Sequence, residues 1–207
     1  MAIEEPKYEV VLTEGQFGVR HYTPILIAET LAEGDMDEAS NKGFRLIADF
    51  IFGYNQVADS TSQGKIAMTA PVTIEPQAAK IPMRAPVTVE PQSEGLNVQS
   101  AKQWRIHFVM PSHYTLASIS QPKNSAVKLR EIPSKHFAVL QCSGFNTAAR
   151  VQTKIQELTD WAQQKNLKSV GTPQLSRYDP PWTLPMFRRN EIMIEIESPK
   201  LDAQKAK

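Results

Sequence analysis

Histidine and cysteine are the residue types in this chain best suited to metal or nucleophilic chemistry, and their spacing admits little of it. The sequence has one cysteine, Cys142, and four histidines, His21, His107, His113 and His136. No two histidines have the HxxxH or HExxH spacing of a zinc site, and one cysteine cannot build a cysteine-based site. The GxSxG, P-loop and GxGxxG motifs are also missing, and the carboxylates show no paired pattern. We therefore predict that the protein is not an enzyme.

His21 is the histidine whose surroundings suggest chemistry. It shares one side of an alternating segment with Phe17 and Val19. If that side is buried, a neutral imidazole reaches an apolar interior, where it can ligate iron, including the iron of a haem. A surface histidine or a hydrogen-bonded core histidine fits the same pattern. His107 alternates against Trp104 and its apolar neighbours, so we expect it to face solvent.

Three further residues could contact a ligand. Met68 and Met83 occupy matching positions in a local repeat, residues 65–77 and 80–92. A thioether can ligate haem iron or pack against a flat ring, although core packing is the usual role. The repeat is typical of two extended segments, and its prolines favour edge positions. Arg188 adjoins a proline-rich loop, where it could pair with carboxylates of a ligand or remain a solvated surface charge.

The elements that must position these residues are many short strands and two helices. Period-two alternation and apolar runs predict strands at 8–13, 17–21, 25–32, 104–110, 127–132, 137–142, 173–178 and 191–197, with a strand region at 65–90. One helix is expected from an N-cap at Asp37 to Phe52, and another from Asn146 or Thr147 to Lys165. This order indicates an α+β fold with a largely antiparallel sheet and two similar halves.

The first helix has an unusually wide apolar surface. One stripe and two residues almost opposite it are apolar: Phe44, Ile47, Ala48 and Ile51, then Leu46 and Phe50. A sheet on one side cannot bury so wide a surface. Loops could cover the remainder, or the helix could form the wall of an apolar pocket.

Bulk composition describes an ordinary globular domain. The chain has 207 residues, 41% of them hydrophobic and 22% charged, and a net charge of +1. This small net charge argues against a nucleic-acid or anionic-membrane partner. No apolar run reaches the length of a transmembrane helix, and the N-terminus lacks the features of a secretory signal. We therefore expect, by default, a cytoplasmic protein, and the sequence leaves its oligomeric state open.

Five motifs in order resemble the SOUL/haem-binding protein family. They are YEV with VRHY at residues 8–22, GFRL to GYN at 43–55, KIAMTAPV at 65–72, FVMPS at 108–112, and RYDPP with RRNE at 177–191. The KIAMTAPV segment is the most specific of them. The second copy of this segment, with Arg84 in place of Thr, departs from the family pattern.

The resemblance implies a fold, a ligand and a site. The fold would be a twisted antiparallel sheet of about eight strands, a distorted barrel, with two helices in a duplicated βαββ arrangement over residues 1–198 and a polar tail at 199–207. The ligand would be haem or a related tetrapyrrole, which the protein would carry or buffer. The groove would use Phe44, Ile47, Ala48, Ile51, Met68 and Arg188, and His21 matches a proposed axial iron ligand of one family branch.

The same fold is similar to multidrug-effector domains of bacterial regulators. The alternative function is therefore a binding module for lipophilic small molecules or cations, and a pocket hydrolase is a third possibility. No helix-turn-helix segment is available, which argues against a DNA-binding regulator.

Overall fold

The computed structural model describes residues 4–56, 64–77, 97–180 and 182–199. The second copy of the repeat, including Met83, and the tail from residue 200 lie outside these ranges. The main sheet contains β1 (Tyr8–Glu14), β2 (Phe17–Tyr22), β3 (Ile25–Glu33), β5 (Val72–Gln77), β6 (Gln103–Val109), β8 (Lys128–Ile132), β9 (Lys135–Cys142), β10 (Gln174–Arg177) and β11 (Asn190–Ile196). The remaining elements are β4 (Asn55–Gln56), β7 (Gln121–Pro122), α1 (Met36–Ile51), α2 (Ala148–Gln164) and a 3₁₀ turn, η1 (Pro185–Phe187).

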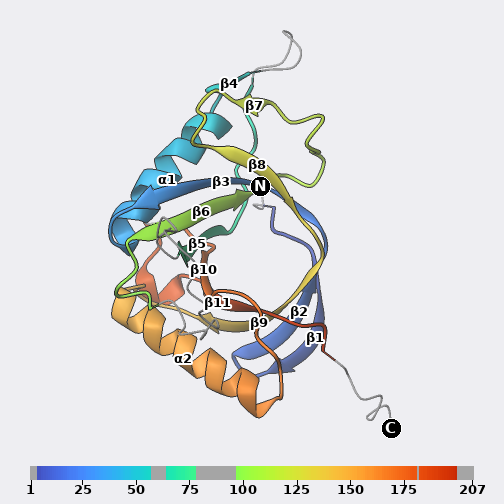
Figure 1. Ribbon diagram of the computed structural model, residues 1–207, viewed down its shortest axis with the longest axis vertical. Coiled ribbons are helices and arrows are strands. Elements are labelled where there is room, and N and C mark those ends of the chain that lie inside the picture. The colour runs from blue at the N-terminus through green and yellow to red at the C-terminus, as the bar shows by residue number, and fades with distance from the viewer. Residues whose placement is uncertain (1–3, 57–63, 78–96, 181, 200–207) are drawn as a thin grey trace, which may run out of the picture.

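The nine strands form one antiparallel sheet in the order β1-β2-β9-β11-β10-β5-β6-β3-β8, and β4 pairs with β7 separately. The sheet curls around a central space, and both helices lie on its outer side (Figure 1). The predicted α+β fold with a distorted barrel is confirmed, with nine strands where the family resemblance implied about eight.

The helices begin where side chains can satisfy their free N–H groups. Asp35 caps α1 by accepting hydrogen bonds from the backbone of Asp37 and Glu38 at 3.0 and 2.8 Å. The predicted cap at Asp37 is therefore two residues late, because two aspartates follow Gly34 and the first of them reaches the free groups. Thr147 caps α2, and it is one of the two start positions that the sequence left open.

The α1 helix packs closely on β3 and β6. Gly43 allows this approach, because a Cβ atom at that position would lie only 2.7 Å from Ile106 on β6. On the far side of the helix, Phe50 belongs to the same buried cluster as Ile66 and Ile119, which come from loops beside β4 and β7. Loops therefore cover most of the wide apolar surface, one of the two alternatives that the sequence left open.

The α2 helix lies over β9 and β11, so the two helices cover separate parts of one sheet. No helix among the described residues has the length and hydropathy needed to cross a membrane.

Candidate ligand-binding sites

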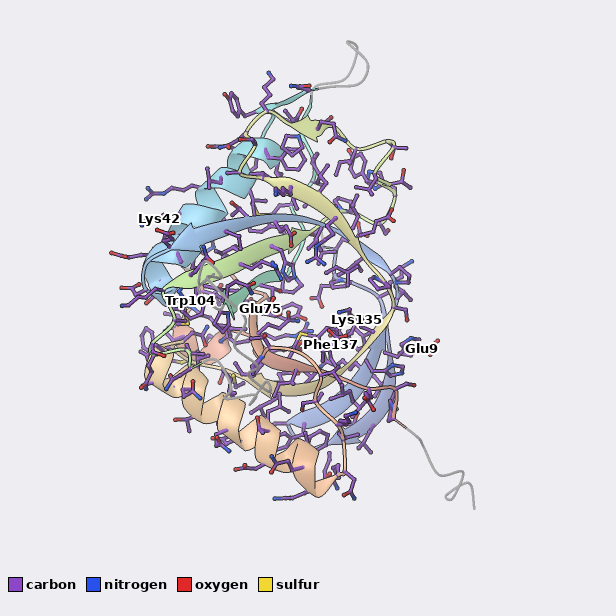
Figure 2. All side chains as sticks on the ribbon, viewed as in Figure 1. Glu9, Lys42, Glu75, Trp104, Lys135 and Phe137 are labelled. Atoms are coloured by element: carbon purple, nitrogen blue, oxygen red, sulfur yellow. The ribbon has the colours of Figure 1, made fainter. Side chains whose placement is uncertain are left out.

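The two faces of the sheet carry different side chains. The outer face, beneath the helices, presents buried apolar residues such as Ile106, Leu140 and Ile192. The inner face is lined by charged and polar side chains, including Glu75, Arg105 and His107. Figure 2 shows Glu75 and two residues of β9, Lys135 and Phe137, inside the curl of the sheet.

His21 lies on the outer face near the edge of the sheet. Its ring stacks on that of His136 with centroids 4.3 Å apart, its Nε2 hydrogen-bonds to Ser134, and its Nδ1 lies 3.8 Å from a Glu9 oxygen. The alternation with Val19 was predicted correctly, but His21 lies where the strand ends. Its side chain is about one-third exposed and not enclosed by apolar residues.

His21 and α1 are far apart. Four strands separate β2, which carries His21, from β6 beneath α1. At about 4.8 Å per strand, the five steps amount to roughly 24 Å along the curved sheet. The structure therefore does not bring His21 together with the other predicted pocket residues.

Three of the four predicted pocket positions on α1 are core residues. Ile47, Ala48 and Ile51 are buried against the sheet. Phe44 is 39% exposed, and its ring centroid lies 5.4 Å from that of Phe108. Met68, which precedes β5, is also 39% exposed. Phe44 and Met68 are therefore the apolar members of the predicted set that a ligand can reach.

A partly buried arginine lies beside the first two turns of α1. Arg177, at the end of β10, donates to the Ser40 hydroxyl at 3.1 Å and lies 3.5 Å from an Asp37 oxygen. Among the described residues its buried Nε atom has no hydrogen-bond partner. Burial lowers the pKa of Arg177, Asp37 opposes that shift, and the positive charge of Arg188 adds to it. Arg177 and Arg188 therefore form an electropositive spot that favours an anion.

The loop between β10 and β11 presents apolar side chains to solvent. Four of them are exposed by 58–82%: Trp182, Leu184, Met186 and Phe187. The backbone bond from Tyr178 to Arg189, at 3.1 Å, closes the base of the loop, and Gly144 donates to Pro185 at 2.8 Å. In Figure 1 this orange-red loop lies between α1 and α2.

Sequence reasoning missed these four residues because the segment was interpreted only as a proline-rich connection. The signal available was its content of large apolar side chains, which is unusual for an exposed loop. We define the α1–loop surface as Phe44, Met68, Arg177, Arg188 and the 182–187 loop. Strand register links Phe44 and Arg177, because Val72 pairs with Phe108, which contacts Phe44, and also with Arg177.

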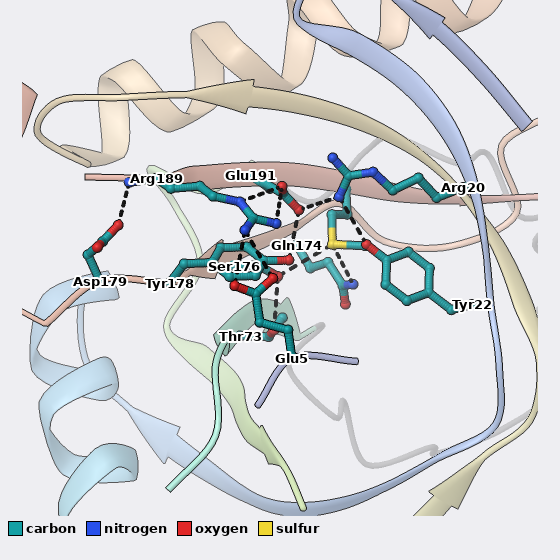
Figure 3. Close-up of polar contacts among 11 residues, drawn as sticks. Glu5, Arg20, Tyr22, Thr73, Gln174, Ser176, Tyr178, Asp179, Arg189 and Glu191 are labelled. Atoms are coloured by element: carbon teal, nitrogen blue, oxygen red, sulfur yellow. Dashed lines mark hydrogen bonds and ion pairs between the residues drawn. The ribbon is translucent and has the colours of Figure 1, made fainter. Parts of the chain in front are cut away.

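A network of charged groups lines one end of the inner face. Glu191 of β11 is 0% exposed and accepts hydrogen bonds from Arg20 at 2.8 Å and Tyr178 at 2.8 Å, and from Arg189 at 3.1 Å (Figure 3). Arg189 also pairs with Glu5 of the N-terminal segment at 3.0 Å. Both cations are thus occupied by carboxylates, so this network has a structural role.

The described residues contain no group of three or more His, Cys, Asp or Glu side chains arranged to hold a metal ion. The candidate ligand site is therefore the exposed apolar surface beside Arg177 and Arg188, on the outer side of the curled sheet.

Residues 3–195 match the family described as SOUL heme-binding protein. The chain belongs to this family. Comparison with curated proteins gives no match. The five sequence motifs that suggested the family all lie within the matched range.

Several solved structures share the fold. The C-terminal domain of EcmrR superposes with a TM-score of 0.59 at 11% identity, covering 89% of this chain and 98% of that domain. A hydrolase from Listeria innocua gives a TM-score of 0.56 at 10% identity, covering 90% of this chain and 94% of that protein. An uncharacterized conserved protein from the same organism gives 0.58 at 11% identity, covering 88% and 92%. At such low identity these similarities establish the architecture of this SOUL-family chain and nothing further about its chemistry.

Proposed function

We propose that this protein binds haem or a related tetrapyrrole on the α1–loop surface and serves as a carrier or buffer of that ligand. The observation that carries the proposal is the group of exposed apolar side chains at residues 182–187 beside Arg177 and Arg188, in a chain of the SOUL heme-binding family. Exposed apolar side chains gathered in this way mark interaction sites in soluble proteins.

The chemistry of a haem suits this surface. A flat apolar macrocycle would pack against Phe44, Met186 and Phe187, because aromatic and thioether groups stack well on extended rings. The haem propionates would pair with Arg177 and Arg188, since arginine binds carboxylates through two parallel hydrogen bonds.

The iron ligand is a separate question. Met68 contributes a sulfur atom on the same surface and is a candidate for it. The prediction that His21 ligates the iron stays a prediction, and a haem bound to His21 would occupy a different region from α1, since four strands lie between β2 and β6. We propose that binding at the α1–loop surface is independent of His21.

Titration of the apo-protein with hemin tests the proposal. We expect a saturable, red-shifted Soret band near one equivalent. Substituting Phe187 by Ser, or Arg188 by Gln, should weaken hemin binding, because each removes a contact to ring or propionate. Val170 is the control for Phe187: it is an exposed apolar residue, at 51% against 71% for Phe187, and lies outside this surface. Unsaturable binding, or equal effects of Phe187→Ser and Val170→Ser, would contradict the proposal.

Two measurements separate the roles of His21 and Met68. His21→Ala should leave both the Soret position and hemin affinity unchanged, whereas Met68→Leu should shift the Soret band if its sulfur ligates the iron. A changed Soret band in His21→Ala would indicate that the haem binds near β2 and not on the α1–loop surface.

Lipophilic cations are the alternative ligands. They would require a carboxylate without a paired cation, and the buried Glu191 already has Arg20 and Arg189. Haem is therefore the better-supported ligand. Thermal-shift measurements with porphyrins and with cationic dyes distinguish the two classes, because only a ligand of the native state raises the unfolding temperature.

A further inference from the structure

The inner face of the sheet encloses a second space that the haem proposal does not use. The cavity has a volume of about 1000 Å³ and is lined by strands from both halves of the chain and by α2 residues such as Gln152, Ile155 and Thr159. It lies on the opposite side of the sheet from α1, so a ligand bound there would not touch the α1–loop surface. Its volume is that of a site for a small organic molecule.

His107 is a buried polar group on the wall of this cavity. It is 6% exposed, and among the described residues its Nδ1 has no hydrogen-bond partner. Burial lowers its pKa to about 4, an effect that nearby Glu29 opposes and that Arg130 and Arg105 reinforce. At neutral pH the ring is uncharged, so one nitrogen donates and the other accepts a hydrogen bond.

Glu75 and Arg105 lie side by side next to His107. They face each other in the β5–β6 register, with Arg105 Nη1 3.6 Å from Glu75 Oε2. Arg105 Nε is 3.4 Å from Glu29, and no hydrogen bond joins Arg105 to either carboxylate within the described chain. Glu29 is instead satisfied by Arg130, through bonds of 3.1 and 2.8 Å.

This arrangement leaves an acceptor and a set of donors facing the cavity. Burial raises the pKa of Glu75, and Arg105 offsets only part of that effect. An N–H group from a ligand would therefore stabilise the Glu75 carboxylate. The guanidinium of Arg105 has donors available for an adjacent acceptor on the same ligand.

The opposite wall of the cavity is aromatic and apolar. Tyr22 of β2 and Phe137 of β9 pack edge to face with ring centroids 5.6 Å apart. Met193 and Ile132 complete this wall. Aromatic rings and a thioether favour the face of a flat ring system. The cavity thus has one wall suited to a ring face and another suited to its polar edge.

The charges around the cavity balance. Glu29, Glu75 and Glu195 are matched by Arg105, Arg130 and Lys135, three anions against three cations in mutual ion pairs of 2.5–3.6 Å. A charged ligand would leave one uncompensated charge among these partly buried groups, which is unfavourable. An uncharged ligand would not.

A second hollow of about 620 Å³ lies next to the cavity. It shares six lining residues with the cavity: Pro6, Thr23, Ile25, Val109, Ile132 and Pro133. The N-terminal segment crosses it, with Glu4 accepting a hydrogen bond from the Ser112 backbone at 2.9 Å. The two hollows therefore adjoin each other beside this segment.

We propose that the inner cavity binds an uncharged, planar nitrogen heterocycle whose edge carries a hydrogen-bond donor next to an acceptor, as in nucleobases and pterins. The ring would lie against Tyr22, Phe137 and Met193. Its edge would donate to Glu75, accept from Arg105 and contact His107. This site is independent of haem binding.

Calorimetric titration of the full chain at neutral pH with hypoxanthine and with pterin tests this inference. We expect saturable binding near one equivalent for at least one of them. Glu75→Gln and His107→Leu should each weaken binding about tenfold, the effect of losing one hydrogen bond to a charged or buried group. The matched controls are Glu157→Gln and His113→Leu, which alter exposed residues outside the cavity and should bind like the wild type.

Nuclear magnetic resonance of the wild type keeps the test decisive if a variant fails to fold. Amide shifts at Thr73 and His107 should move on addition of the heterocycle, while those at Trp182 should not, and saturation with hemin should leave the affinity unchanged. The inference is overturned if neither heterocycle binds, if binding is restricted to the cation ethidium or the anion anilinonaphthalene sulfonate, if the cavity variants bind like the controls, or if only the Trp182 region responds.

Discussion

The outer and inner faces of the sheet differ in how they are stabilised. Beneath α1, contact is apolar and tight, with Ile47 and Phe108 fully buried and Gly43 against Ile106. On the inner face, buried groups are ionic, and Glu191 takes bonds from Arg20, Arg189 and Tyr178. One sheet therefore uses hydrophobic packing on one side and paired charges on the other. A large apolar ligand would then suit the outer side of the sheet, and a small hydrogen-bonding ligand would suit the inner side.

Removing one member of the Glu191 network should have the largest effect. Glu191→Leu leaves Arg20 and Arg189 without their shared buried carboxylate, and breaking such a pair costs about 3–5 kcal/mol. Urea denaturation followed by circular dichroism measures the change in the free energy of unfolding. Glu157→Leu, which removes an exposed carboxylate on α2, is the control. If both variants lose equal stability, the inner face does not depend on paired charges.

Acid should destabilise the inner face through His107. Its pKa is about 4 in the folded protein and 6.5 in the unfolded chain, so the unfolded state binds the proton first as pH falls. The stability contribution is complete above pH 6.5 and is lost toward pH 4, amounting to about 3 kcal/mol.

The variant His107→Gln should have a flatter stability profile across this interval when unfolding is measured at several pH values. His136→Gln is the control, because His136 is only half-buried. If the free energy of unfolding of His107→Gln depends on pH as steeply as that of the wild type, groups other than His107 cause the effect. Glu75, whose pKa is raised by burial, acts in the opposite direction as the pH falls toward the ordinary carboxyl pKa of 4.5, and makes the net wild-type change smaller.

The close contact beneath α1 should resist a single added methyl group. In Gly43→Ala the new Cβ would lie 2.7 Å from Ile106, and overpacking of this kind costs about 1–3 kcal/mol despite the higher helix propensity of alanine. Thermal unfolding measures the loss. Gly43→Ala combined with Ile106→Val should recover part of it. A stabilised single variant would show that α1 can move away from β6.

The exposed loop should contribute least to stability. Trp182→Ser with Phe187→Ser should change the free energy of unfolding by less than about 0.5 kcal/mol, because both side chains already face solvent. Hemin affinity should nevertheless fall, which separates binding from folding at this site. Large destabilisation would show that the loop is part of the core.

Several features followed from the sequence. Alternation and apolar runs identified the strands, because residues i and i+2 face the same side of a strand. Thr147 marked the start of α2, because its hydroxyl reaches a free backbone N–H. The five ordered motifs identified the family over residues 3–195. The strands, the start of α2 and the family all depend on local geometry or on sequence pattern, and both can be recognised before the tertiary structure is known.

The prediction for His107 was wrong for a reason that lies in the tertiary structure. Alternation correctly separated it from Trp104 and Ile106, and the opposite side was taken to be solvent. Because the sheet curls, that side is enclosed, and His107 becomes a buried cavity group. The alternation of residues along a strand assigns them to the two faces of the sheet, but it does not show whether one face or both faces are buried.

The same limit applies to the candidate haem site. The sequence determined that α1 has an unusually wide apolar surface and that Arg188 adjoins a proline-rich loop. Only the folded chain decided that loops bury Phe50, that Phe44 and Met68 remain accessible, and that four strands separate His21 from them. Strand order and curvature arise from pairings between residues far apart in the sequence. Local patterns therefore specify what each element presents, and long-range pairing decides which elements meet.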